Sequence, residues 1–63
     1  MLIERTSRLS GDVHVMDIDV LPIQITLWEQ GELVQNAMPE LSADEREFIM
    51  TGITPTEWDE FFN

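Results

Sequence analysis

The sequence has no cysteine, lysine or tyrosine, and it has a single histidine, His14. Without cysteine, the chain can form neither a disulfide bond nor a metal site built on thiolates. The same absences remove most of the side chains that enzymes use as nucleophiles and general bases. We therefore expect no enzymatic activity, no catalytic residue and no cofactor.

Long hydrophobic runs are also missing. No stretch approaches the roughly 20 apolar residues that cross a bilayer. The first residues, Met1–Thr6, include Glu4 and Arg5, and no apolar run long enough for a secretory signal follows them. We therefore expect a cytoplasmic protein with no membrane partner.

Positive charge is scarce. Thirteen acidic residues face three arginines, Arg5, Arg8 and Arg46, which gives a formal net charge of −10. Direct nucleic-acid binding requires basic side chains at the phosphates, so we exclude it. A strongly negative surface instead fits a partner protein with a basic surface, such as one that normally holds nucleic acid. The alternative is that the acids only keep a small protein soluble.

The short length predicts one domain, residues 1–63, and a domain of this size buries only about 60% of its unfolded surface. Its core is expected to supply roughly 3–5 kcal/mol of stability, and no disulfide adds to it. This thin margin favours a homodimer or a stabilising partner. Apolar pairs that a second copy could cover are Ile23 with Leu27 and Phe61 with Phe62.

The first third of the chain predicts an antiparallel β-hairpin, in which Leu2–Leu9 pairs with Val13–Val20 across a turn at Ser10–Asp12. In the second run, apolar residues alternate with aspartates, which is the period of a half-buried strand. A two-stranded ribbon is marginal alone, so we expect helices to cover its apolar face.

His14 is expected at the surface or rim of the hairpin, since nothing near it completes a set of metal ligands. Paired carboxylates, Asp17 with Asp19 and Asp44 with Glu47, are the remaining candidates for a hard cation such as Mg2+ or Ca2+. Solvated acidic faces explain these pairs more simply. We therefore expect no metal site.

The middle of the chain is ambiguous between helix and strand. Apolar residues alternate within Leu21–Gln30, but Pro22 suits a first helical turn and Gly31 suits a helix end. We choose a helix of about two turns for this segment. A further short helical turn is expected within Glu32–Met38, ended by Pro39.

The last third contains two helix-start signals. Ser42 and Glu45 form a capping box, S-x-x-E, and Gly52 suits the left-handed end of that helix. Thr54 and Glu57 form a second box, T-x-x-E. Two short helices joined by a glycine corner are therefore predicted.

Three aromatic residues of the last helix, Trp58, Phe61 and Phe62, fall on one stripe at i, i+3 and i+4. The simplest interpretation is that this stripe packs into the core. The alternative is that the helix is a docking segment for another protein. Both interpretations hold if the helix is half buried.

These elements predict an α+β fold, an N-terminal two-stranded antiparallel β-hairpin packed against three or four short helices. The expected core consists of Met16, Ile18, Val20, Ile25, Trp28, Val34, Phe48, Ile49, Ile53 and Trp58.

The segment REFIMTGITPTEWDEFF, residues 46–62, is similar to one found in a group of phage proteins. The chain resembles small uncharacterised proteins encoded in bacteriophage genomes, which carry a DEREFIMTGITPEEW-like segment. It departs from their pattern at Leu21–Thr26. The resemblance implies a phage-encoded accessory protein in the cytoplasm of a bacterial host, and it brings no activity with it. The matching pieces are Ser7–Gly11, Met16–Val20, Trp28–Gly31, Val34–Ala37, Pro39–Leu41 and Asp44–Trp58.

Two functions fit these observations. In the first, a phage-type accessory protein binds a host or phage protein through its acidic surface, and inhibits or modulates nucleic-acid handling. In the second, the protein has a structural, assembly or self-associating role, and its acidity serves solubility. The first function assigns partner binding to Asp44, Glu47, Glu57, Asp59 and Glu60, with Trp58, Phe61 and Phe62 as apolar anchors.

Overall fold

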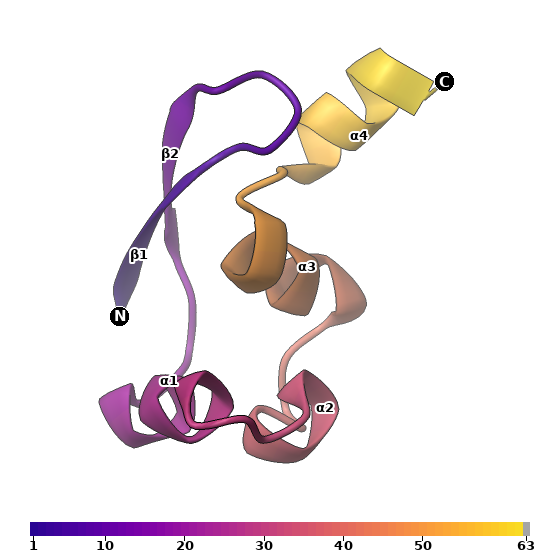
Figure 1. The fold of residues 1–63 in the computed structure, drawn as a ribbon. Coiled ribbons are helices and arrows are strands. Elements are labelled where there is room, and N and C mark those ends of the chain that lie inside the picture. The colour runs from indigo at the N-terminus through magenta and orange to yellow at the C-terminus, as the bar shows by residue number, and fades with distance from the viewer. Residues whose placement is uncertain (63) are drawn as a thin grey trace.

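The computed structural model describes residues 1–62 and places a β-hairpin before four short helices (Figure 1). Asn63, the last residue of the predicted domain, lies outside the described residues. The α+β fold predicted from the sequence is confirmed. In chain order the elements are β1 Leu2–Thr6, β2 Val13–Asp17, α1 Pro22–Glu29, α2 Val34–Ala37, α3 Ala43–Thr51 and α4 Pro55–Phe62.

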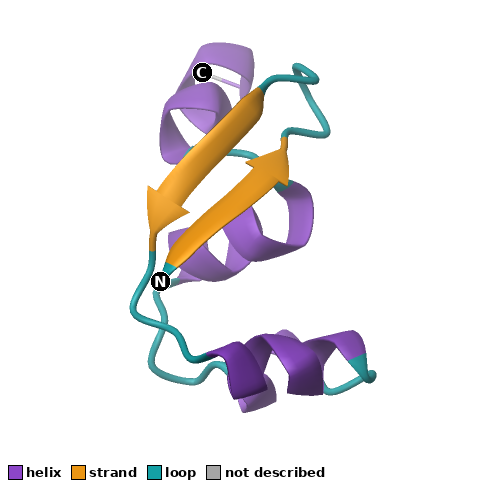
Figure 2. Ribbon diagram, turned by 90° about the vertical axis from the view of Figure 1, so that its left-hand side faces the viewer, coloured by secondary structure: helices purple, strands orange, loops and turns teal. Residues whose placement is uncertain are grey.

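The hairpin lies across α3 with one face toward the helices (Figure 2). On that face Ile3 pairs with Met16 and Arg5 pairs with His14, and Ile3 is buried. The other face is exposed to solvent, since none of the helices within residues 1–62 covers it. It carries Leu2, Glu4, Thr6, Val13, Val15 and Asp17.

The hairpin loop is longer than predicted because the first strand already ends at Thr6 and the loop begins at Ser7. The amide of Ser7 donates to the carbonyl of Asp12 at 2.8 Å. The buried Ser7 hydroxyl accepts from the amides of Leu9 at 3.2 Å and Ser10 at 3.3 Å. These local bonds replace the ladder bonds of a strand. Residues 7–9 therefore belong to the loop, and the predicted strand Leu2–Leu9 is too long.

The second strand is also shorter than the predicted Val13–Val20, since it ends at Asp17. Beyond it, Ile18 and Val20 are buried as the alternating pattern predicted. The amide of Val20 donates to the carbonyl of Ile18 at 2.8 Å, which makes a tight three-residue turn. This turn directs the chain away from the sheet and into α1.

The ambiguous segment Leu21–Gln30 contains helix α1, so the prediction of a helix there is confirmed. Gln24 caps the start of this helix, because its side-chain oxygen accepts a hydrogen bond from the amide of Leu21 at 2.9 Å. Its side-chain nitrogen donates to the carbonyl of Ala37 at 3.1 Å and so joins α1 to α2. The expected short turn after it is α2, which stops before Pro39.

Helix α3 begins and ends at its predicted signals. The Ser42 hydroxyl accepts from the amide of Glu45 at 3.1 Å, and the Glu45 carboxylate accepts from the amide of Ser42 at 2.9 Å. Gly52 ends the helix with a φ of 75°, and its amide donates to the carbonyl of Phe48 at 2.7 Å.

Five predicted core residues are buried, namely Ile18, Val20, Phe48, Ile49 and Ile53, and the other five are only partly buried: Met16, Ile25, Trp28, Val34 and Trp58. The prediction missed four buried hydrophobic residues that lie near element ends or in the short helix α2. They are Ile3, Ala37, Met38 and Leu41. In so small a domain, side chains beside the turns complete the core.

Two of the three arginines bind main-chain carbonyls. Arg5 donates through Nε to the carbonyl of Ile49 at 3.1 Å, which satisfies an open acceptor in the last turn of α3. Arg46 donates through Nε to the carbonyl of Met38 at 3.2 Å and through Nη2 to that of Pro39 at 2.9 Å. Arg5 thus joins β1 to α3, and Arg46 joins α3 to the segment that precedes it.

None of the helices within residues 1–62 has both the length and the hydropathy needed to cross a bilayer.

Candidate functional site

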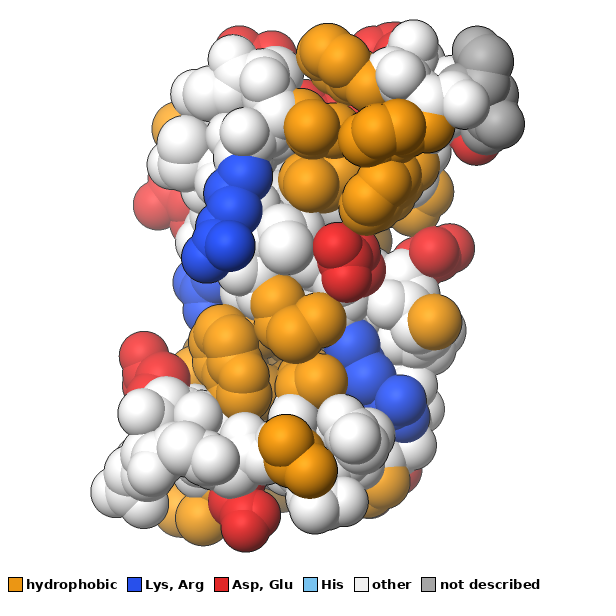
Figure 3. All heavy atoms as spheres, turned by 45° about the vertical axis from the view of Figure 1, so that its right-hand side comes forward, with side chains coloured by type: hydrophobic (Ala, Val, Ile, Leu, Met, Phe, Trp, Pro, Cys, Tyr) orange, Lys and Arg blue, Asp and Glu red, His pale blue; other side chains and the backbone are white. Residues whose placement is uncertain are grey.

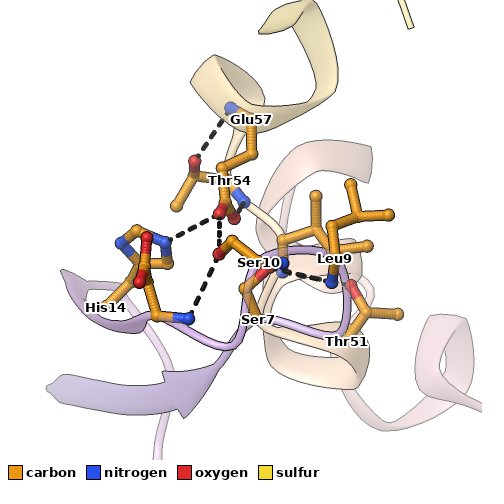
Figure 4. Close-up of polar contacts among 9 residues, drawn as sticks. Ser7, Leu9, Ser10, His14, Thr51, Thr54 and Glu57 are labelled. Atoms are coloured by element: carbon orange, nitrogen blue, oxygen red, sulfur yellow. Dashed lines mark hydrogen bonds and ion pairs between the residues drawn. The ribbon is translucent and has the colours of Figure 1, made fainter. Parts of the chain in front are cut away.

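Glu57 joins the hairpin loop to α4 (Figure 4). Its capping box forms as predicted, since the amide of Glu57 donates to the Thr54 hydroxyl at 3.1 Å and the amide of Thr54 donates to Glu57 Oε1 at 3.3 Å. The other carboxylate oxygen, Oε2, accepts from the hydroxyl of Ser10 at 2.5 Å. Glu57 is only 5% exposed. It therefore faces inward and is not part of the acidic surface to which sequence reasoning assigned it.

His14 faces the same carboxylate oxygen as Ser10 (Figure 4). Its Nε2 atom is 3.2 Å from Glu57 Oε2, which is an ion-pair distance if the ring is protonated. That nitrogen is shielded from solvent and has no hydrogen-bond partner among the described residues. The Asp12 carboxylate completes the cluster, because one ligand atom from each of the three residues lies within 4.8 Å of the other two.

The pKa of Glu57 is lowered from 4.5 to about 2, and the hydrogen bond from Ser10 is the largest cause. Burial acts in the opposite direction, because it disfavours a charged carboxylate. Smaller lowering contributions come from His14, Ser7 and Thr54. The carboxylate is therefore ionised at neutral pH, although it is buried.

The aromatic ridge, defined as Trp58, Phe61 and Phe62, lies on α4 and is not buried core. Trp58 is half-buried, whereas Phe61 is 53% exposed and Phe62 is 60% exposed. The rings of Trp58 and Phe62 have centroids 4.6 Å apart and planes inclined by 33°. Figure 3 shows hydrophobic side chains gathered at the end of the molecule where α4 lies. The simplest interpretation of this stripe was thus wrong for both phenylalanines.

The acidic residues predicted to bind a partner divide between two helices. Asp59 and Glu60 are exposed on α4, beside the aromatic ridge. Asp44 is exposed in the first turn of α3, at the end of that helix away from α4, and Glu47 is half-buried one turn later. The structure therefore gathers the three aromatics with Asp59 and Glu60, and it separates Asp44 and Glu57 from them.

A second exposed region surrounds α1. An open, shallow depression there is lined by Asp19, Leu21, Gln24 and Glu40, and the Gln24 side chain donates to the Glu40 carboxylate at 3.2 Å. These groups include two carboxylates and one amide, but no nucleophile. The predicted dimer pair Ile23 and Leu27 is exposed on the same helix, by 58% and 39%.

Sequence reasoning missed the meeting of Asp12, His14 and Glu57. Asp12 and His14 stand two positions apart, and alternate residues of a strand share a face. That spacing was a readable signal. Glu57, however, reaches them only because the fold brings together Ser10 and Glu57, which are 47 positions apart. No local pattern shows such a contact.

Comparisons with known proteins return no match. No family model fits the chain, and no curated protein or solved structure is significantly similar to it. The resemblance to bacteriophage proteins therefore stays a prediction from the sequence.

Proposed function

We propose that this protein is a small acidic accessory module of bacteriophage type that binds another protein through α4. Its partner is a host or phage protein with a basic surface, and the binding inhibits or modulates nucleic-acid handling in the bacterial cytoplasm. The module acts by association and performs no catalysis. The observation that carries this proposal is the exposed aromatic ridge on a helix whose first turn is fixed to the body of the protein.

The aromatic ridge has the properties of an interface anchor. Phe61 and Phe62 are more than half exposed, although large aromatic side chains gain most from removal from water. A few such residues usually supply most of an interface's binding energy. The bonds of Glu57 to Ser10 and Thr54 hold α4 in place before a partner arrives, which lowers the entropy lost on binding.

Charge supports a basic partner. The chain has a formal net charge of −10, and Asp59 and Glu60 stand next to the aromatic ridge. Arg5 and Arg46 direct their donors to main-chain carbonyls. A negative field of this kind attracts a positive surface and raises the rate of encounter, while the aromatic contacts determine how long the complex lasts.

A binding experiment in bacterial lysate tests this proposal with three double variants. Phe61→Ala/Phe62→Ala removes the anchors, and Asp59→Asn/Glu60→Gln removes the neighbouring charges. Ile23→Ala/Leu27→Ala is the matched control, because it removes an exposed apolar pair from α1 instead. We expect the partner to be recovered by wild type and by the control, but not by the anchor variant.

Salt separates the two contributions. The charge variant should bind more slowly than wild type at low salt, and the difference should vanish once the Debye length falls below about 10 Å. The purified partner should then release nucleic acid when wild type is added. Equal recovery of the partner by wild type and by the anchor variant would refute the proposal.

The alternative function, self-association in a structural or assembly role, is favoured by the exposed pair Ile23 and Leu27 and by the uncovered face of the hairpin. Sedimentation at high micromolar concentration tests it. A particle of 7.3 kDa would exclude a homodimer. A larger particle that Ile23→Ala/Leu27→Ala converts to monomer would support the alternative.

A further inference from the structure

Three side chains that commonly bind metals converge where the hairpin loop meets α4. Asp12 and His14 come from the end of the loop and the start of β2, and Glu57 comes from the first turn of α4. One ligand atom from each lies within 4.8 Å of the other two. We propose that these three residues bind a divalent transition-metal ion of the Zn2+ class, and that the ion fastens α4 to the hairpin.

The chemistry of the donors selects this class of ion. One imidazole nitrogen with two carboxylate oxygens is a set that Zn2+ accepts, whereas Mg2+ and Ca2+ prefer oxygen ligands alone. Two carboxylate ligands also suit the charge of a dication. Three protein ligands leave a fourth tetrahedral position for water.

The spacing of the cluster is close to that of a zinc site. Ligand atoms roughly 2.0–2.2 Å from a tetrahedral Zn2+ ion lie about 3.4 Å from one another. The Nε2 atom of His14 and Oε2 of Glu57 are 3.2 Å apart. The remaining separations reach at most 4.8 Å, so the exposed Asp12 side chain would have to move closer to complete the set.

The second observation concerns the Nε2 nitrogen of His14, whose side chain is 28% exposed. Nε2 is buried and has no hydrogen-bond partner among residues 1–62, yet it faces the carboxylate of Glu57. In a neutral ring protonated at Nδ1, its lone pair would oppose the lone pairs of the carboxylate. A cation between the two atoms removes this repulsion. A metal ion does so with the ring neutral, and a proton on Nε2 is the competing occupant.

Hydrogen bonds already orient Glu57 for such a role. The Ser10 hydroxyl donates to Oε2 and the Thr54 amide donates to Oε1, while each carboxylate oxygen keeps a further lone pair. Partners of this kind fix the direction of metal ligands and strengthen binding. The ion would bridge two segments that are distant in sequence, so its binding would oppose separation of α4 from the hairpin.

The test titrates the tag-free full chain with ZnSO4, and separately with MgCl2, while nuclear magnetic resonance follows the imidazole. His14 is the only histidine, so its ring nitrogen signals are unambiguous. We expect Zn2+ to shift the Nε2 signal at an equimolar ratio and MgCl2 to leave it unchanged. An Nε2 signal that does not respond to Zn2+ overturns the proposal and leaves the proton as occupant.

Calorimetry on variants gives an independent measurement. We expect His14→Gln and Asp12→Asn each to weaken Zn2+ binding at least about tenfold. The matched control Glu32→Gln, which removes an exposed carboxylate elsewhere, should bind as wild type does. Unchanged affinity in a folded His14→Gln protein would place the ion on surface carboxylates and refute the site. Neither measurement involves a protein partner, so the outcome is separate from that of the proposed function.

Discussion

The α-carbon of Gly52 packs directly against the main-chain carbonyl of Thr6, so that a Cβ atom on residue 52 would overlap the Thr6 oxygen. This contact lies where the end of α3 meets the end of β1. Gly52 also has a φ of 75°, which disfavours any residue with a side chain. One glycine therefore sets both the corner between two helices and the approach of the sheet.

Gly52→Ala should destabilise the fold strongly. We expect it to lower the free energy of unfolding by more than about 2 kcal/mol, from the left-handed conformation and the displaced strand together. Gly11→Ala is the matched control, because Gly11 has a φ of 79° and open space around it. Its loss should be about 1 kcal/mol. Urea denaturation followed by circular dichroism measures both. Equal losses would show that β1 moves aside at no cost.

Truncating aromatic residues to alanine should cost more stability in the buried core than in the exposed aromatic ridge. Phe48 is fully buried, and Phe48→Ala should cost about 3–5 kcal/mol, enough to unfold a domain of this size. Phe62→Ala should cost less than about 1 kcal/mol, because that ring is 60% exposed. Trp58→Ala should fall between them. Thermal melts of the three variants provide the ranking, and a Phe62→Ala protein as unstable as Phe48→Ala would contradict it.

The stability contributed by Glu57 should depend on pH in a defined window. Its pKa is about 2 in the folded protein against 4.5 for an ordinary glutamate, so folding favours the ionised form. The contribution is therefore complete above pH 4.5 and is lost as the pH falls from 4.5 to 2. The difference in melting temperature between wild type and Glu57→Gln should shrink across this window. Glu60→Gln, at an exposed site, is the control. A difference that stays constant with pH would be inconsistent with the low pKa.

Loss of the two capping boxes should affect different helices. Ser42→Ala and Thr54→Ala should each cost about 1 kcal/mol, since each removes the hydroxyl that accepts an open helix amide. Only Thr54→Ala should raise hydrogen exchange selectively in α4. Faster exchange in α4 for both variants would mean that the helix is held by the general stability of the domain.

Local signals in the sequence were sufficient for the elements of the fold. The boxes at Ser42 and Thr54 and the left-handed Gly52 are short-range patterns, and the helices begin and end at them. Alternation in the hairpin correctly indicated the burial of Ile18 and Val20. These features depend on residues within four positions of one another, which is the range that periodicity and capping describe.

Contacts across the chain could not be predicted in this way. A capping-box glutamate is ordinarily a surface residue. Glu57 is buried instead, because the fold brings the hairpin loop and its Ser10 hydroxyl against the carboxylate. Helical spacing placed Phe61 and Phe62 on one stripe of the helix. Spacing shows which side chains share a face, but it does not show how deeply that face is buried. The early end of β1 depends on the side chain of Ser7, which accepts hydrogen bonds from the amides of its own loop. The sequence does not show whether a serine hydroxyl bonds to solvent or to the nearby main chain.

The bond between Ser10 and Glu57 also fixes an order of events during synthesis. The hairpin is synthesised first, but the Ser10 hydroxyl finds its carboxylate acceptor only after 47 further residues have been made. Closing so long a loop carries an entropic cost. Bonds from Arg5 to Ile49 and from Arg8 to Thr51 already hold the hairpin and its loop to α3 and so bear part of that cost. A nascent chain that ends before α4 can therefore pack its hairpin on α3, but its loop still lacks the Glu57 carboxylate, so the last helix completes the anchoring of that loop.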